Sequence, residues 1–138
     1  MSIQHKNKTI AALLATLGGA IGLYRFYLGG FTDKWGWLHF ASLPLSLGIY
    51  FFDHDIHAFF AFAPLIFSAL AGCLISLVMG TMSDEKWDIK FNAGSGKQSN
   101  SAWPIALTLV LTLAIGAGCL IAVIARTFDL LFTGGLYG

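Results

Sequence analysis

Apolar residues gather along the chain in four long runs that short polar segments separate. The runs cover residues 9–28, 35–52, 58–82 and 103–125. Each holds about twenty residues, which is the length of helix needed to cross the ~30 Å hydrocarbon core of a bilayer. Backbone N–H and C=O groups cannot stay unpaired in lipid, so such runs must be helical. The pattern predicts an all-α integral membrane protein with four transmembrane helices arranged as antiparallel hairpins.

The polar segments divide the chain into four predicted parts. Residues 1–60 form a two-helix hairpin, 61–82 a third transmembrane helix, 83–102 a polar loop, and 103–138 a fourth transmembrane helix with a short tail. The loop opens with SDEKWDIKFN, which predicts an interfacial helix with Trp87 turned toward lipid, and continues as the flexible linker AGSGKQSNSA. Four crossings place both termini on one side of the membrane. The distribution of Lys and Arg does not decide which side that is.

The composition supports lipid as the surrounding solvent. Hydrophobic residues make up 57% of the chain and charged residues only 11%, against about 25% charged in soluble domains. So few polar residues cannot cover a domain of this size in water. The net charge of +1 without a basic run argues against nucleic acid as a partner. The expected partners are therefore the lipid bilayer and other membrane protein subunits, or a second copy of the chain.

Small residues recur every four positions in three of the runs. Helices in lipid associate where small residues let their backbones approach closely. The spaced residues are Ala11, Ala15 and Gly19 in the first run, Ser68, Gly72, Ser76 and Gly80 in the third, and Ala114, Gly118 and Ala122 in the fourth. Packing within one chain and contact with another chain both remain open. The fourth run is the best candidate for the second role, because a long loop separates it from the others.

Arg25 lies at the end of the first run, in the stretch GLYRFYLGG. Aromatic residues on both sides of it are typical of the membrane–water interface. An arginine there can extend its charged end into water, which avoids most of the cost of a charge in hydrocarbon. The residues alone therefore predict an interface anchor for the first hairpin, with Gly29 and Gly30 permitting the turn that follows.

The same stretch carries a family resemblance. KNKTIAALLATLGGAIGLYRFYLGG resembles the opening of the TM-two (two-transmembrane) domain family, and IYFFD resembles the end of that family's second span. The matching residues are Gly22, Arg25, Phe26, Tyr27, Leu28, Gly29 and Asp53. Tyr24 stands where the family usually has Asp or His, so an acidic or titratable partner at that position is not carried over.

The resemblance covers about residues 6–60, and the rest of the chain is similar to longer bacterial members. It implies a location in the bacterial cytoplasmic (inner) membrane, and it implies an architecture more than an activity.

No residues predict a catalytic, metal or cofactor site. In DHDIH, His54 and His57 stand three apart and Asp53 and His57 four apart, a spacing that a divalent metal could use. No further ligand cluster completes such a site, so we interpret the stretch as a polar turn that favours the start of the next helix. His39 in the second run is interpreted as hydrogen-bonded packing. GSGKQS lacks the first glycine of a phosphate-binding loop.

These observations favour a non-enzymatic membrane protein, namely an accessory, regulatory or scaffold subunit that acts through helix–helix contacts. The alternative is an oligomeric small channel or transporter. Ion and proton carriers place ionisable groups at membrane depth. The four runs contain only His39 and the terminal Arg25, and this counts against the alternative.

Overall fold

A computed structural model describes residues 4–137, and all regular structure in this part of the chain is helical. The α-helices are α1 (Lys8–Gly18), α2 (Leu23–Gly29), α3 (Lys34–Phe52), α4 (Ala58–Ala61), α5 (Ala63–Thr81), α6 (Asp84–Phe91) and α7 (Trp103–Thr133). Two 3-10 turns, η1 (Gly19–Ile21) and η2 (Gly30–Thr32), lie on either side of α2. The predicted all-α class is confirmed for these residues. Residues 1 and 138, the outer limits of the predicted parts, lie outside them.

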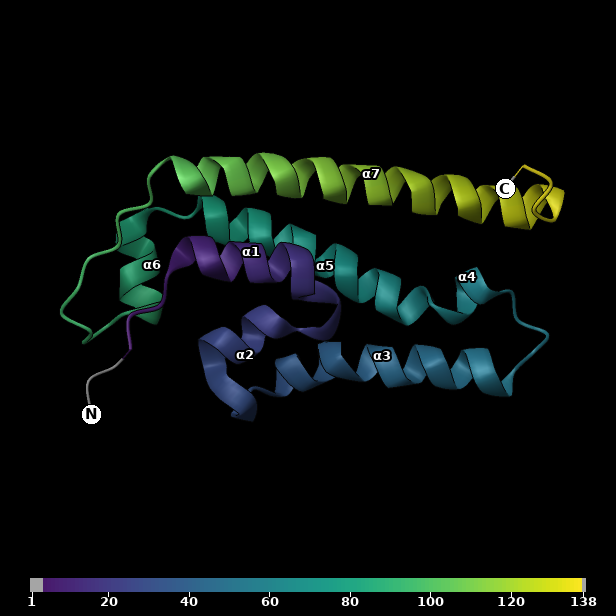
Figure 1. Cartoon of the computed structure of the whole chain (residues 1–138), viewed down its shortest axis with the longest axis horizontal. Helices are drawn as coiled ribbons and strands as arrows, with labels where there is room; N and C mark the ends of the chain where they lie inside the picture. The colour runs from purple at the N-terminus through teal and green to yellow at the C-terminus, as the bar shows by residue number, and fades with distance from the viewer. Residues whose placement is uncertain (1–3, 138) are drawn as a thin grey trace.

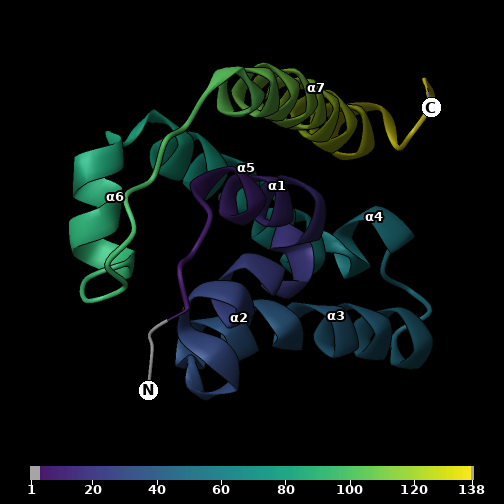
Figure 2. The ribbon, with the colours of Figure 1, turned by 60° about the vertical axis from the view of Figure 1, so that its left-hand side comes forward.

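Helix α5 is the centre of the arrangement. It contacts α1, α3, α7 and the turn η1, and Figure 1 shows α7 along one side of it and α3 along the other. The N-terminal segment and α6 lie together at one end of the molecule. Figure 2 shows how the segment after α6 runs back past the N-terminal segment to the start of α7.

Two helices are long and apolar enough to cross a membrane, α5 with 19 residues and α7 with 31. The prediction of four continuous spans is therefore wrong in its number. The first run does not form one membrane-length helix, because α1 ends at Gly18 and a new helix starts at Leu23. Gly22 between them has φ +74°, a backbone conformation that ends a helix. The 11 residues of α1 extend only about 16 Å.

The other runs form helices with different limits from those predicted. Helix α3 matches the second run closely, but its Trp, His, Ser and Pro residues keep it outside the set of membrane-length apolar helices. In the third run the helix is interrupted at Phe62. Pro64 occupies the first turn of α5, where a missing N–H is harmless. Helix α7 begins at Trp103 as predicted and continues past residue 125 to Thr133.

The polar loop contains the predicted short helix, but its tryptophan does not face lipid. Ser83 caps α6, and Trp87 is fully buried. Its indole N–H donates to the Lys6 carbonyl at 2.9 Å, and its ring centroid lies 4.4 Å from that of Phe91. The prediction for Trp87 is wrong because the N-terminal segment supplies the partner that a buried indole N–H requires.

Candidate functional site

The break between α1 and α2 exposes a backbone carbonyl that two serines satisfy. Ser68 of α5 donates to the Ala20 carbonyl at 2.7 Å, and Ser42 of α3 lies 3.1 Å from the same oxygen. A buried carbonyl without a partner costs about 1–3 kcal/mol. Serines from two neighbouring helices therefore stabilise an interruption that lipid would not tolerate.

His39 of α3 connects this carbonyl to Tyr24 of α2. Its Nδ1 lies 2.7 Å from Ser68 Oγ, and its Nε2 lies 3.2 Å from the Tyr24 hydroxyl. The Ser68 hydrogen points at Ala20, because two bare oxygens 2.7 Å apart would repel. Nδ1–H therefore donates to Ser68, and Nε2 accepts from Tyr24. We call Ala20, Tyr24, His39, Ser42 and Ser68 the helix-break network; in it His39 is hydrogen-bonded packing, as its sequence position predicts.

A second group of hydroxyls joins α1, α5 and α7. Thr16 Oγ1 lies 2.6 Å from Thr112 Oγ1 and 2.9 Å from Ser76 Oγ. Ser76 donates to the Ala12 carbonyl at 2.8 Å. Ser76 and Thr112 have no exposed surface, so these hydrogen bonds link the three helices away from any solvent.

The small-residue stripe of α5 lies on its buried face. Ser68, Gly72, Ser76 and Gly80 are all buried. A Cβ atom built on Gly72 would lie 2.5 Å from the Gly19 Cα, so the backbones of α5 and η1 are in direct contact. Gly80 faces Leu109 of α7. This stripe therefore packs within the chain.

The stripe of α7 has the opposite placement. Ala114, Gly118 and Ala122 are exposed, and a Cβ added to Gly118 would meet nothing within 4 Å. The residues of α7 that are buried against α1 and α5 are Ile105, Thr108 and Thr112. Helix α7 thus packs through one face near its start and leaves its small-residue face open.

Arg25 is paired within the chain. Its guanidinium lies 3.3 Å from an Asp33 carboxylate oxygen, and both side chains are only partly exposed. The same oxygen accepts the backbone N–H groups of Trp35 at 2.9 Å and Gly36 at 3.2 Å, at the start of α3. Arg25 therefore fastens the end of α2 to the start of α3 through Asp33. Asp33 had no role in the prediction from the sequence, although its place just before α3 is that of an N-cap residue.

The other residues of the aromatic stretch pack around this turn. Gly22 faces Gly36 so closely that an added Cβ would lie 2.9 Å from the Gly36 carbonyl oxygen. The Phe26 ring centroid lies 5.5 Å from that of Trp37. The Tyr27 hydroxyl accepts the Asn7 N–H at 2.8 Å.

The remaining members of the predicted site divide: Gly29 adjoins Asp33, the partner of Arg25, whereas Asp53 lies far from that pair. Leu28 packs beside the buried cluster around Tyr24, and an added Cβ on Gly29 would collide with the Asp33 side chain. Asp53 lies just past the far end of the 19-residue α3 and accepts the Asp55 N–H at 3.2 Å. That helix is about 28 Å long, so Asp53 is remote from the Arg25 turn.

The polar turn before α4 contains a helix cap. His57 Nδ1 accepts the Phe59 N–H at 3.1 Å. Across residues 4–137 no three His, Cys, Asp or Glu side chains gather in a way that could hold a metal ion.

A buried lysine links the N-terminal helix to α6. Lys8 is 5% exposed, and its ammonium group donates to Asp84 at 2.5 Å and to the Met82 carbonyl at 2.8 Å. The other Asp84 oxygen accepts the Ser101 N–H at 2.7 Å. One carboxylate thus holds together α1, α6 and the segment that leads into α7.

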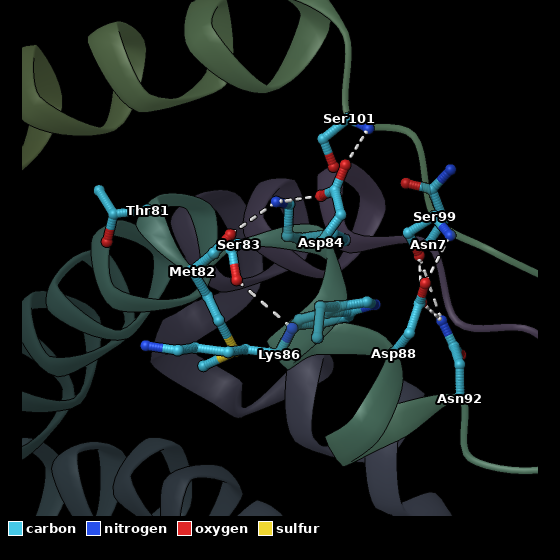
Figure 3. A network of polar contacts seen from close by, with 12 residues as sticks. Asn7, Thr81, Met82, Ser83, Asp84, Lys86, Asp88, Asn92, Ser99 and Ser101 are labelled. Atoms are coloured by element: carbon cyan, nitrogen blue, oxygen red, sulfur yellow. Dashed lines mark hydrogen bonds and ion pairs between the residues drawn. The ribbon is translucent and has the colours of Figure 1, made fainter.

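Asp88, one turn later in α6, fastens the same segment again. It accepts the backbone N–H and the hydroxyl of Ser99, each at 2.6 Å, and the Asn92 amide at 2.7 Å. These hydrogen bonds lower the pKa of the Asp88 carboxyl. Asn92 in turn accepts the Lys6 N–H at 2.7 Å (Figure 3 shows Asp88, Asn92 and Ser99). The prediction of a wholly flexible linker is therefore wrong, because two carboxylates of α6 hold it.

The Lys8–Asp84 pair predicts a loss of stability in acid. Burial of the Asp84 carboxyl opposes ionisation, but hydrogen bonds from Lys8 and Ser101 outweigh it and lower the pKa to about 2. An unfolded aspartate titrates near 3.9, so the folded protein binds fewer protons and stability rises with pH between about 2 and 4. Acidification through that window should cost about 1–2 kcal/mol, allowing for solvent screening.

Chemical unfolding at pH 2 and pH 5 measures this loss. The variant Asp84→Asn, which has no carboxyl to titrate at that position, should show a clearly smaller difference between the two pH values. An equal acid loss in both proteins would contradict the assignment to Asp84.

Comparisons with family descriptions, curated proteins and solved structures find no match for the chain. Its class therefore rests on its own features, which are those of a helical protein with two helices long and apolar enough to cross a membrane. The resemblance to TM-two domain proteins stays a prediction.

Proposed function

We propose that the chain is a non-enzymatic membrane protein, an accessory or scaffold subunit that uses the open face of α7 to contact other subunits or a second copy of itself. Helices α5 and α7 cross the membrane in this proposal. Helices α1 and α3 lie against α5, and α2 packs against α1 and α3. The resemblance of residues 6–60 to TM-two domain proteins supports a location in the bacterial cytoplasmic membrane.

The exposed stripe of α7 carries the proposal. The stripe of α5 has the same four-residue spacing, and there it brings two backbones into contact at Gly72 and Gly19. On α7 the equivalent residues Ala114, Gly118 and Ala122 are exposed, and a Cβ added to Gly118 would meet nothing within 4 Å. A surface with the same chemistry and no internal occupant fits a helix from another chain.

The polar groups inside the fold favour this docking role over transport. The hydroxyls of Thr16, Ser76 and Thr112 are hydrogen-bonded to one another and to backbone carbonyls, and α5 contains no Asp, Glu, Lys or Arg. Carriers of ions or protons need ionisable groups at membrane depth that can change partners.

Gly118→Leu tests the docking face. The new side chain would enter open space in the isolated chain, so stability should change little, whereas a helix packed on the stripe would be pushed away. Chemical cross-linking and native mass spectrometry in mild detergent should show a complex for the parent protein and at least a tenfold loss of it for the variant, which corresponds to about 1.4 kcal/mol.

Gly48→Leu is the matched control. Gly48 is also a helix glycine whose added Cβ would meet nothing, but it lies on α3. This variant should keep the complex. A parent protein that is monomeric and captures no subunit from its native membrane would contradict the proposal.

A further inference from the structure

A lateral groove lies between α3 and α5, beside the helix-break network. Its volume of about 610 Å³ falls within the range of small-molecule binding sites, about 300–1,000 Å³. Its walls are mostly apolar, with Trp35, Leu38, Leu45, Pro64 and Phe67 among the lining residues. Four of these five are more than half exposed, so the groove is open to whatever surrounds the helices.

Three polar residues of the helix-break network line the same groove, His39, Ser42 and Ser68. Both ring nitrogens of His39 are already engaged, by Ser68 and by Tyr24. Ser68 gives its hydrogen to the Ala20 carbonyl, and Ser42 gives its own to the His39 carbonyl at 2.6 Å or to Ala20. Every donor of these three residues is therefore in use.

What remains at that end is acceptor capacity. A serine hydroxyl has one hydrogen and two lone pairs. Among residues 4–137, Ser42 Oγ receives no hydrogen bond, and Ser68 Oγ receives one, from His39. In the part of the chain that the structure describes, no Lys, Arg, Asp or Glu lines the groove. A group that binds at these serines must therefore donate a hydrogen bond, and the lining offers no charge to compensate one on the group.

We propose that this groove binds a neutral lipid alcohol, with its alkyl chain along α3 and α5 and its hydroxyl donating to Ser42 Oγ. The apolar walls suit the chain, and the unused lone pairs of Ser42 suit the hydroxyl. Phosphate and carboxylate groups themselves bring only acceptors and negative charge, so they cannot donate to the serine oxygens. This binding is separate from the docking face on α7, and the two proposals can fail independently.

A pair of photoreactive lipids tests the proposal. The full-length protein, reconstituted in phospholipid nanodiscs, is irradiated with hexadecanol that carries a diazirine in its chain, or with the methyl ether of the same compound. The ether keeps the chain and loses the donated hydrogen bond. A single hydrogen bond is worth a factor of about 2–12 in binding. Labelling of peptides 35–45 and 64–71 should therefore be at least about threefold stronger for the alcohol.

Two variants with a matched control locate the site. Ser42→Ala removes the acceptor while Ser68 still satisfies the Ala20 carbonyl, so the alcohol-to-ether ratio should fall to about one. Ala41→Phe would narrow the groove that Ala41 lines and should lower labelling by the alcohol. Ala125→Phe, at an exposed position of α7 outside the small-residue stripe, should leave it unchanged.

The parent protein alone can overturn the proposal. Equal labelling of the groove by alcohol and ether would show ordinary contact with lipid chains. Labelling spread over the exposed helices, or an alcohol preference that survives Ser42→Ala, would also overturn it.

Discussion

Gly72→Ala should lower the free energy of unfolding by about 3 kcal/mol, which places it at the upper end of overpacking effects. The added Cβ would lie 2.5 Å from the Gly19 Cα and 2.6 Å from the Ala15 carbonyl oxygen. Both neighbours are backbone atoms, so no side-chain rotation can relieve the collision and α5 must move away from α1. The Ser68 and Ser76 hydrogen bonds on either side of Gly72 would lengthen with it.

Gly48→Ala provides the matched control for the same substitution in a helix. No atom lies within 4 Å of its added Cβ, and alanine favours a helix over glycine by about 1 kcal/mol. The control should be as stable as the parent or slightly more so, by thermal unfolding in detergent followed by circular dichroism. Equal losses in the two variants would contradict the backbone contact between Gly72 and Gly19.

Asp84→Asn should lower the free energy of unfolding by about 2 kcal/mol. Removal of one partner from a fully buried ion pair costs about 3–5 kcal/mol, and the 29% exposure of the Asp84 side chain moderates that cost. The variant leaves the buried Lys8 ammonium with neutral acceptors only, the amide oxygen of the new side chain and the Met82 carbonyl. The N-terminal end of α1 should separate from α6, and Lys8 should become reactive toward an amine-specific reagent.

Glu85→Gln is the control on the next residue. It removes the same charge from an exposed position in the first turn of α6, and surface changes of this kind are usually within about 0.5 kcal/mol. Peptide mapping of the labelled protein should find Lys8 modified much faster in Asp84→Asn than in Glu85→Gln. Equal protection of Lys8 in the two variants would contradict the proposal that the Lys8–Asp84 ion pair holds α6 against α1.

Local patterns in the sequence predict part of this fold well. The start of α7 at Trp103 and the extent of α3 follow from apolar runs bounded by polar residues. The four-residue spacing of Gly72 and its neighbours predicts a packing face, because a period of about four residues returns to one side of a helix. That spacing cannot say which helix lies opposite, and so the internal role of the α5 stripe and the open face of α7 emerge only from the structure.

The polar networks could not be predicted, since their partners lie far apart in the chain. Lys8 and Asp84 are separated by 76 residues, and Thr16 and Thr112 by 96. The break after Gly18 was hidden because an apolar run reads the same whether its helix is continuous or interrupted. Its one local signal is the cluster of three glycines, Gly18, Gly19 and Gly22, which also suits close helix packing.

In the proposed membrane arrangement, the length of α7 sets how the molecule sits in a bilayer. Its 31 residues extend about 46 Å, whereas the hydrocarbon core is about 30 Å thick. Burying the entire helix would require a tilt of about 50°, beyond the range of up to about 40° seen for transmembrane helices. With Trp103 at one boundary, the opposite boundary falls near residue 123, just before Arg126, which pairs with Asp129 at 2.6 Å. The last turns of α7 would then extend as a helix into the water on the opposite side of the membrane from α6.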